Sequence, residues 1–138
     1  MERKDEILDK ILSVEVLDAM ADWVKVVNIK GKILYANQAL KDAIGYDPTG
    51  TNTDDLDDFL KLDTSETTSA IEKNEIIQKE LNIGDNYYQV KCSPIYDEKM
   101  NPIAIVEVFR DVTRERVLEL QLIQSNENVF HDMEITKR

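Results

Sequence analysis

The chain has 138 residues, the length of one ordinary domain, and 42% of them are hydrophobic, which is enough for a single compact core. A net charge of −11 and a pI near 4.5 argue against binding to nucleic acid or anionic lipid surfaces, because an acidic surface repels both. No apolar run reaches the roughly 18–20 residues that span a bilayer, and the first ten residues lack the apolar stretch of a signal peptide. We therefore expect a cytoplasmic protein with no nucleic-acid partner and no membrane insertion.

The chain has one cysteine, Cys92, and one histidine, His131. A single cysteine cannot form an internal disulfide, which suits a reducing cytosol. One cysteine and one histidine are too few for a typical zinc site. The sequence therefore predicts neither a disulfide nor a structural transition metal.

Residues 1–20 predict an amphipathic helix. Ile7, Ile11 and Val14 recur at helical spacing, and charged residues take the opposite face. Two roles are open for this helix: it docks on its own domain, or it forms a contact in a dimer.

A β-hairpin and a helix are expected next. Residues 23–27 and 33–36 are rich in strand-forming side chains, and Gly31 suits the turn between them. Asn37 is a typical N-cap for a following helix, and Gly45 is a typical residue to end it.

Residues 53–62 predict a short helix with Thr53 or Asp54 as its cap. The four aspartates of this segment lack the spacing of a calcium loop, and the helix dipole favours acidic residues in a first turn. We therefore interpret them as residues of a helix start and not as metal ligands. A less regular helix is expected over residues 65–73.

Three strands and a long helix complete the chain. Residues 75–83, 87–96 and 103–112 predict an antiparallel meander, with a tight turn at Gly84. Residues 113–138 predict a charged helix. Its apolar stripe fits a short, interrupted coiled-coil seam, formed by Leu118, Leu122, Val129 and Met133.

Three local motifs follow one another in a distinctive order. Residues 22–46 (DWVKVVNIKGKILYANQALKDAIGY) contain an Asn-x-Ala and a Gly-Tyr, residues 88–97 (YQVKCSPIYD) contain a Ser-Pro, and residues 108–115 (VFRDVTRE) contain an Asp-Val-Thr. They resemble the opening hairpin and first core helix, the fourth strand, and the close of the last strand of the PAS domain family. Each motif is weak alone, but their order and spacing over about residues 5–125 carry the resemblance.

The resemblance implies an α+β fold, in which a five-stranded antiparallel sheet of order 2-1-5-4-3 has the core helices on one face. It divides the chain into an N-terminal helix (1–20), a PAS core (21–113) and a signalling or coiled-coil helix (114–138) that leads to an effector domain outside this chain. It also implies a sensory and dimerisation module that forms a homodimer and regulates that effector. A ligand-free scaffold that only dimerises is the alternative.

The resemblance also bears on cofactors. The common haem sensors of the family need an axial histidine on the helix before the third strand, and residues 65–75 contain none. The flavin–cysteinyl photoreceptors need a cysteine in an Asn-Cys-Arg-Phe motif in the helical region, whereas Cys92 falls in a strand. His-ligated haem and cysteinyl-flavin are therefore not expected. The chain holds no cofactor or an unknown small molecule, and a non-covalent flavin stays open.

Strand alternation gives a candidate pocket, because successive side chains point to opposite faces of a sheet. Matching the chain to the family directs one face of the first, fourth and fifth strands toward the core helices. The candidate pocket residues are Lys25, Val27, Tyr88, Val90, Cys92, Glu107 and Phe109.

Lys25 and Glu107 then lie on neighbouring strands and can form an ion pair. Isolated buried charges cost several kcal/mol, so each needs the other or a ligand. One interpretation is an internal salt bridge that fills a domain without a ligand. The other is a polar small-molecule site formed by Lys25, Glu107 and Tyr88.

No catalytic constellation is visible, because the sequence lacks a nucleophile–base pair and a Gly-rich phosphate loop. We therefore expect a regulatory module and not an enzyme.

His131 lies where a histidine-kinase phosphoacceptor could follow a PAS module, although no kinase-box proline follows it. Residues 131–138 (HDMEITKR) also resemble the linker helix before a metal-dependent serine phosphatase domain, and an exposed helical histidine is the third interpretation. We expect the chain to be the sensory part of a longer bacterial signalling protein with an effector of either type.

Overall fold

The computed structural model describes residue 7, residues 14–60 and residues 75–136. The predictions for residues 65–73 and for most of residues 1–13 lie outside the described residues. In chain order the described helices and strands are α2 (Val14–Ala19), β1 (Trp23–Asn28), β2 (Ile33–Ala36), α3 (Gln38–Ile44), α4 (Thr53–Leu60), β3 (Ile77–Ile83), β4 (Asn86–Tyr96), β5 (Pro102–Asp111) and α6 (Thr113–Thr136).

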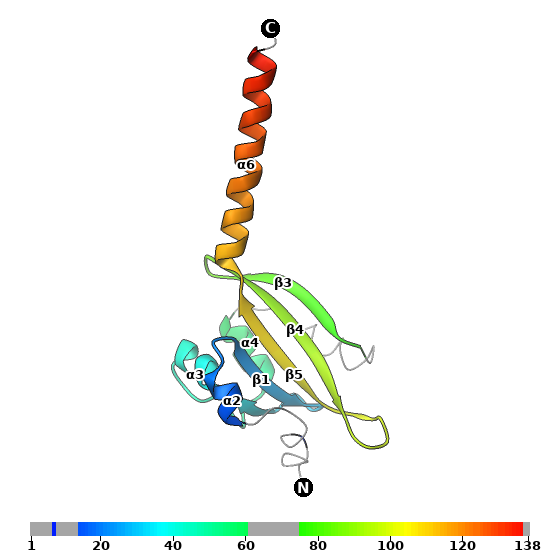
Figure 1. The fold of residues 1–138 in the computed structure, drawn as a ribbon. Coiled ribbons are helices and arrows are strands. Elements are labelled where there is room, and N and C mark those ends of the chain that lie inside the picture. The colour runs from blue at the N-terminus through cyan, green and yellow to red at the C-terminus, as the bar shows by residue number, and fades with distance from the viewer. Residues whose placement is uncertain (1–6, 8–13, 61–74, 137–138) are drawn as a thin grey trace.

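The five strands form one antiparallel sheet of order β2-β1-β5-β4-β3 (Figure 1), which confirms the order that the family resemblance implies. The central strand β5 lies between β1 and β4. Its register places Glu107 opposite Lys25 of β1 on one side and opposite Cys92 of β4 on the other. Three candidate residues from distant parts of the sequence therefore form one row across the middle of the sheet.

The ends of α3 lie where the sequence places them. The side-chain oxygen of Asn37 accepts a hydrogen bond from the backbone N–H of Leu40 at 3.1 Å, which caps the first turn. Gly45 ends the helix in the left-handed conformation, with φ of 84°, which glycine adopts without steric strain.

The predicted cap of α4 is wrong. Neither Thr53 nor Asp54 caps this helix; instead the side-chain oxygen of Asn52 accepts from the backbone N–H of Asp54 at 2.8 Å. The reason is that α4 already begins at Thr53, so the capping position falls on Asn52. The hydroxyl of Thr53 accepts a hydrogen bond from Lys25 instead.

Both faces of the sheet carry apolar clusters. On the face toward α3 and α4, one cluster contains Val27, Ile33, Ala36, Leu40, Ile44 and Leu56. A second cluster on this face, the inner face, contains Tyr88, Val90, Cys92, Ile105 and Phe109. The opposite, outer face carries Ile7, Val26, Leu34, Ile103 and Ala104. Ile7 is 1% exposed, so at this residue the N-terminal segment packs against its own domain.

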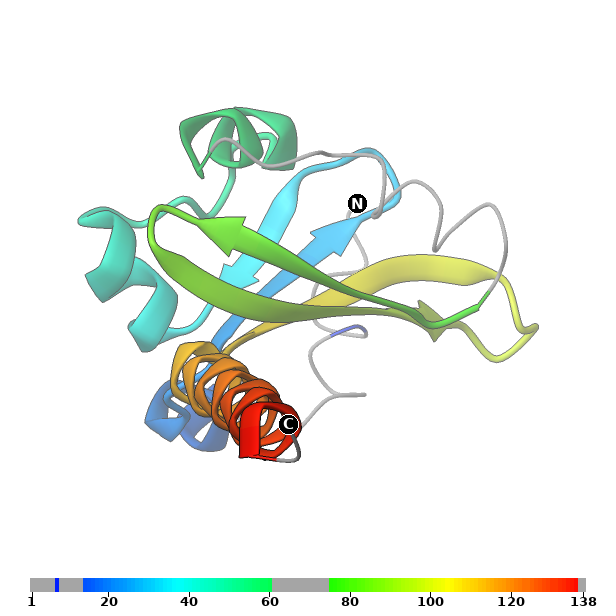
Figure 2. The same ribbon diagram turned by 90° about the horizontal axis from the view of Figure 1, so that it is seen from above.

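The long helix α6 leaves the sheet at the end of β5 and projects away from the domain (Figure 1). Viewed nearly along α6, β3 and β4 separate it from α4 (Figure 2), so the output helix starts on the side of these strands opposite to α4. Leu118 and Leu122 of its predicted stripe are both more than half exposed. None of the helices in the described part of the chain is long and apolar enough to cross a membrane.

Candidate functional site

All seven candidate pocket residues are buried, with no side chain more than 6% exposed. Val27 packs beneath α3 and α4, whereas Tyr88, Val90, Cys92 and Phe109 belong to the second inner-face cluster. Lys25 and Glu107 lie on β1 and β5 between residues of these clusters. The structure therefore gathers the seven on the inner face, and their binding of a ligand stays a prediction.

The predicted ion pair between Lys25 and Glu107 is confirmed, and it belongs to a larger buried group. The Lys25 ammonium lies 3.0 Å from Oε2 of Glu107 and 2.9 Å from Oδ1 of Asp57. It also donates to the hydroxyl of Thr53 at 2.6 Å. On the far side, the Cys92 thiol donates to Oε1 of Glu107 at 3.4 Å. We call these five residues the Lys25 cluster.

The loop between α3 and α4 positions Thr53 and Asp57 over the sheet. The backbone N–H of Ile33 in β2 donates to the carbonyl of Thr51, and the N–H of Gly50 donates back to the carbonyl of Ile33. The N–H of Thr53 then donates to the carbonyl of Gly31 in the hairpin turn at 2.7 Å. These bonds fix the start of α4 beside β1, and one helical turn carries Asp57 to the same side as Thr53.

The cluster places two carboxylates around one ammonium, and its charges shift the pKa values. Burial alone would lower the pKa of Lys25, but Glu107 and Asp57 outweigh it, so the pKa of Lys25 is raised. Burial raises the pKa of Asp57, and the Lys25 ammonium opposes this rise without cancelling it. The lysine therefore stays charged, and the surplus negative charge favours proton uptake at Asp57.

An aromatic group borders the cluster. The ring of Trp23 lies 4.8 Å from the ring of Tyr88 and 6.1 Å from that of Phe109, measured between centroids. The Lys25 ammonium lies 5.9 Å from the centroid of Phe109, within the range of a cation–π contact. Tyr88, which the sequence groups with Lys25 and Glu107 in a polar ligand site, thus contributes to an aromatic wall with Trp23.

The arrangement is already self-complementary. An ammonium has three N–H donors, and three oxygens of the described chain surround Lys25. This favours the internal salt bridge over a site that is open for a polar ligand. Among the described residues no group of three or more histidine, cysteine or acidic side chains could hold a metal ion.

Sequence reasoning missed Thr53 and Asp57 as members of the cluster. A signal was available, because residues four apart on a helix share a face and Leu56 lies beside them on the apolar side of α4. The interpretation of the aspartates as helix-start residues does not fit Asp57, which lies beyond the first turn of α4 and is 4% exposed.

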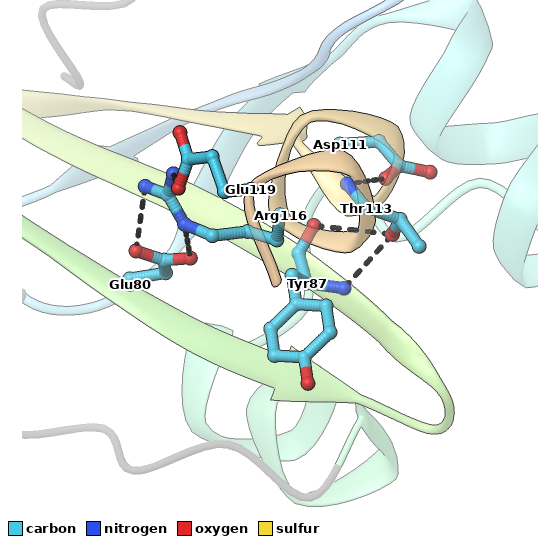
Figure 3. Close-up of polar contacts among 6 residues, drawn as sticks. All are labelled: Glu80, Tyr87, Asp111, Thr113, Arg116 and Glu119. Carbon is cyan, nitrogen blue, oxygen red and sulfur yellow. Dashed lines mark hydrogen bonds and ion pairs between the residues drawn. The ribbon is translucent and has the colours of Figure 1, made fainter. Parts of the chain in front are cut away.

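A second polar group joins α6 to the sheet (Figure 3). The Thr113 hydroxyl oxygen accepts from the backbone N–H of Tyr87 at 2.9 Å, and the N–H of Thr113 donates to Asp111 at 2.9 Å. One turn later Arg116 binds both carboxylate oxygens of Glu80 on β3, one of them from Nη2 at 2.9 Å. The VFRDVTRE motif predicts the junction, but not the partner Glu80.

Solved structures with the same fold include PAS domains and a sensor histidine kinase. A PAS domain from Colwellia psychrerythraea is 23% identical with a TM-score of 0.57, over 72% of this chain and 93% of that chain. A sensory box histidine kinase from Vibrio cholerae is 19% identical with a TM-score of 0.57, over 72% of this chain and 85% of that chain. The PAS domain of the histidine kinase ThkA is 20% identical with a TM-score of 0.58, over 65% of this chain and 99% of that domain.

These identities establish the fold and not a shared signal or output. No curated protein matches the chain. The family model for the PAS domain matches residues 21–114, which include the sheet and the Lys25 cluster. The chain therefore belongs to the PAS domain family.

Proposed function

We propose that this chain is a cytoplasmic sensory and dimerisation module that regulates an effector domain through α6. PAS domains are sensory and regulatory modules, and the solved structures with this fold include domains of histidine kinases. We propose an effector of the serine phosphatase or histidine kinase type in bacterial signal transduction, including a two-component system. The resemblance of residues 131–138 to a phosphatase linker helix supports the first type, and the position of His131 supports the second. The fold alone does not choose between them.

The continuity of β5 and α6 carries the proposal. Glu107 of the Lys25 cluster lies on β5, which ends at Asp111, and α6 starts at Thr113. A change in the cluster therefore acts on the strand that leads directly into the output helix. Since α6 is a continuous helix, a rotation or tilt at its base reaches its far end.

The exposed apolar side chains of α6 support dimerisation. Leu118 and Leu122 are 53% and 63% exposed. Full burial of an exposed leucine contributes about 1.5–3 kcal/mol, so burying the exposed part of each side chain in a contact would contribute about half of that. Two copies of α6 side by side would cover them. Such a pair of helices would pass a change of rotation or register to two effector domains together.

A register test addresses the regulatory role. The chain is fused to a histidine kinase or serine phosphatase catalytic domain, and one to four alanines are inserted after Gln124. Each inserted residue rotates the downstream helix by about 100°. We expect effector activity to vary with insertion number and to return near four insertions. Activity that is unchanged by all four insertions would rule out transmission through α6.

A ligand-free scaffold is the second candidate, and the three oxygens of the described chain that surround the Lys25 ammonium support it. Native mass spectrometry separates the two. A dimer of twice 15.9 kDa with added mass would indicate a ligand-binding sensor, and a dimer at the bare mass would favour the scaffold. If a ligand is retained, Lys25→Met or Glu107→Gln should remove the ligand and keep the dimer. A bare monomer would contradict dimerisation.

His131 offers a third possibility, a phosphoacceptor in a histidine kinase. It lies on α6, and two of the similar structures are named as parts of histidine kinases. Phosphotransfer to His131 in a full-length parent would support this role. Intact output of a His131→Gln parent would exclude it.

A further inference from the structure

The direction of α6 depends on how many points attach it to the domain. At its first residue, Thr113 exchanges hydrogen bonds with the backbone of Tyr87 on β4. A helix held at one end alone can swing about that end. A second attachment one turn further along defines the direction of its axis.

Arg116 supplies this second attachment (Figure 3). Its Nε and Nη2 atoms contact the two carboxylate oxygens of Glu80, in the two-pronged geometry that arginine and carboxylate groups favour. Its third nitrogen, Nη1, binds Glu119 one turn along α6 at 2.9 Å. The Arg116 hydrogen bond lowers the pKa of Glu80, so the pair stays ionised at neutral pH.

Glu80 lies on β3, a strand that contacts both the core and the output helix. Within the sheet, β3 is the edge strand and pairs with β4. The adjacent residue Leu81 packs against the inner-face cluster that contains Tyr88 and Phe109. Because adjacent side chains point to opposite faces, a movement of β3 at the core also moves Glu80 on the outer face.

We propose that Arg116 is a positioning residue, whose ion pair with Glu80 fixes the direction of α6 and couples it to β3. The output helix then receives movements of the core by two routes, through β5 and through the β3 edge. The regulatory meaning of this contact rests on the proposed function, whereas its effect on α6 does not. The 24 residues of α6 span about 36 Å, so a tilt of about 10° at the base displaces the far end by about 6 Å.

Distances between two spin labels test the contact in the whole chain. Cysteines replace the exposed Ala43 on α3 and Gln124 on α6, and both are labelled. Labelled protein is diluted into unlabelled protein so that only distances within one chain are measured. Cys92 is 1% exposed, and mass spectrometry verifies that it carries no label.

Arg116→Gln and Glu80→Gln should each at least double the width of the distance distribution. Arg114→Gln removes an exposed arginine from the same turn and serves as the matched control. In 1 M salt the wild-type distribution should also widen, because the Debye length falls to about 3 Å. Wild-type widths in both Gln variants would overturn the proposal, as would equal broadening by Arg114→Gln.

Exchanging the charges of Glu80 and Arg116 tests whether the ion pair, and not the identity of each side chain, keeps the distance distribution narrow. Glu80→Arg combined with Arg116→Glu and Glu119→Gln restores an opposite-charge pair and removes the repulsion that a glutamate at 116 would meet. This variant should narrow the distribution again, and unchanged urea midpoints would exclude a folding defect. Failure of the rescue in a folded chain would contradict a positional ion pair.

The outcomes separate this proposal from the proposed function. If Arg116→Gln widens the distribution but alanine insertions leave effector activity unchanged, the contact stands and the regulatory role fails. If the insertions change activity but Arg116→Gln leaves the distances as in the wild type, the regulatory role stands and the contact fails.

Discussion

At the scale of single residues, Lys25 is the unusual feature of this domain. A lysine that is 1% exposed must be compensated by its surroundings, because removing an ammonium from water costs several kcal/mol. Here β5 and α4 each supply a carboxylate, so the charge is neutralised from two elements at once. The lysine thereby joins α4 to the sheet.

Lys25→Met should destabilise the chain by about 3–5 kcal/mol, because it leaves Asp57 and Glu107 buried without a cation. Urea unfolding followed by Trp23 fluorescence measures the change, since Trp23 is the single tryptophan. The matched control Lys91→Met removes an exposed lysine of β4 and should stay within about 0.5 kcal/mol of the wild type.

The triple variant Lys25→Met, Asp57→Leu, Glu107→Met replaces every charge of the cluster by an apolar group. We expect it to recover most of the stability that Lys25→Met alone loses, because apolar replacement of a whole buried ion group is often neutral or stabilising. A triple variant as unstable as the single one would show that the loss comes from packing and not from unpaired charge.

The contribution of Asp57 to the stability of the chain should fall as the pH rises, which is opposite to the usual behaviour of an aspartate in an ion pair. Burial raises its folded pKa above the ordinary value of 3.8, so the folded state binds a proton more tightly than the unfolded chain does. Its contribution is present below pH 3.8 and is lost as the pH rises through the folded pKa. The substitution Asp57→Asn changes the free energy of unfolding by an amount that does not depend on pH, and it removes the titrating group. As the pH rises through this window, the wild type should therefore lose stability relative to Asp57→Asn.

Unfolding free energies measured across that pH window test the prediction. Asp55→Asn removes an exposed carboxylate of the same helix and controls for the change in net charge. Parallel curves for the wild type and Asp57→Asn would contradict the assignment of the proton to Asp57.

The residues of the cluster differ in how far the sequence predicts them. Lys25 and Glu107 follow from strand alternation and the order of strands in the family, because a period of two assigns each side chain to a face. Thr53 and Asp57 depend on the rotation of α4 about its axis over the sheet. That rotation is set by hydrogen bonds of the preceding loop to β2 and the hairpin turn, which no periodic pattern records.

At the scale of elements, Asn37 joins three segments. It is fully buried, and its oxygen accepts from the N–H groups of Val24 in β1 and Leu40 in α3. Its amide nitrogen donates to the carbonyl of Leu17 in α2 and to that of Asp22. The cap of α3 therefore also orients α2 and the start of the sheet.

Asn37→Ala should destabilise the chain by about 2–4 kcal/mol, more than the loss of an ordinary cap, because it leaves several buried backbone groups without partners. Asn37→Asp is the matched variant, because it keeps the accepting oxygen and loses the two donated bonds. Denaturant unfolding should rank the wild type above Asn37→Asp and Asn37→Asp above Asn37→Ala. Equal stability of Asn37→Ala and the wild type would show that water replaces all four bonds.

The elements themselves follow largely from local signals. The hairpin, α3 with its cap, and the meander agree with the residues that predict them, because turn glycines and alternating apolar residues act over short distances. The start of β3 is an exception, since the strand begins at Ile77 and not at residue 75. Its partner β4 continues beyond Cys92, which pairs with Ile77, so the length of β4 does not set this end of β3.

At the scale of the whole molecule, the domain combines a sheet that carries apolar clusters on both faces with a long helix whose apolar side chains are exposed. The charge of −11 opposes association, so a dimer must overcome repulsion between two acidic copies. Salt screens that repulsion. Dimerisation through apolar contacts of α6 should therefore strengthen as ionic strength rises.

Leu118→Glu with Leu122→Glu should weaken dimerisation by about 100-fold or more, because each leucine contributes about 1.5–3 kcal/mol when buried. Sedimentation velocity over a concentration series measures the dissociation constant. Leu118 and Leu122 lie within about 40° of each other around the helix, whereas Leu120 and Ile123 lie on roughly the opposite side.

The double change Leu120→Glu with Ile123→Glu is the matched control, because it removes two apolar side chains that are each more than half exposed and adds the same charge. If Leu118 and Leu122 form the seam, this control keeps the dimer, apart from the added repulsion that high salt removes. If the control dissociates the dimer and the first variant does not, the seam lies on the opposite side of α6. A dimer that both variants leave intact would be held by contacts other than these four side chains, which would contradict the role of Leu118 and Leu122 in the seam.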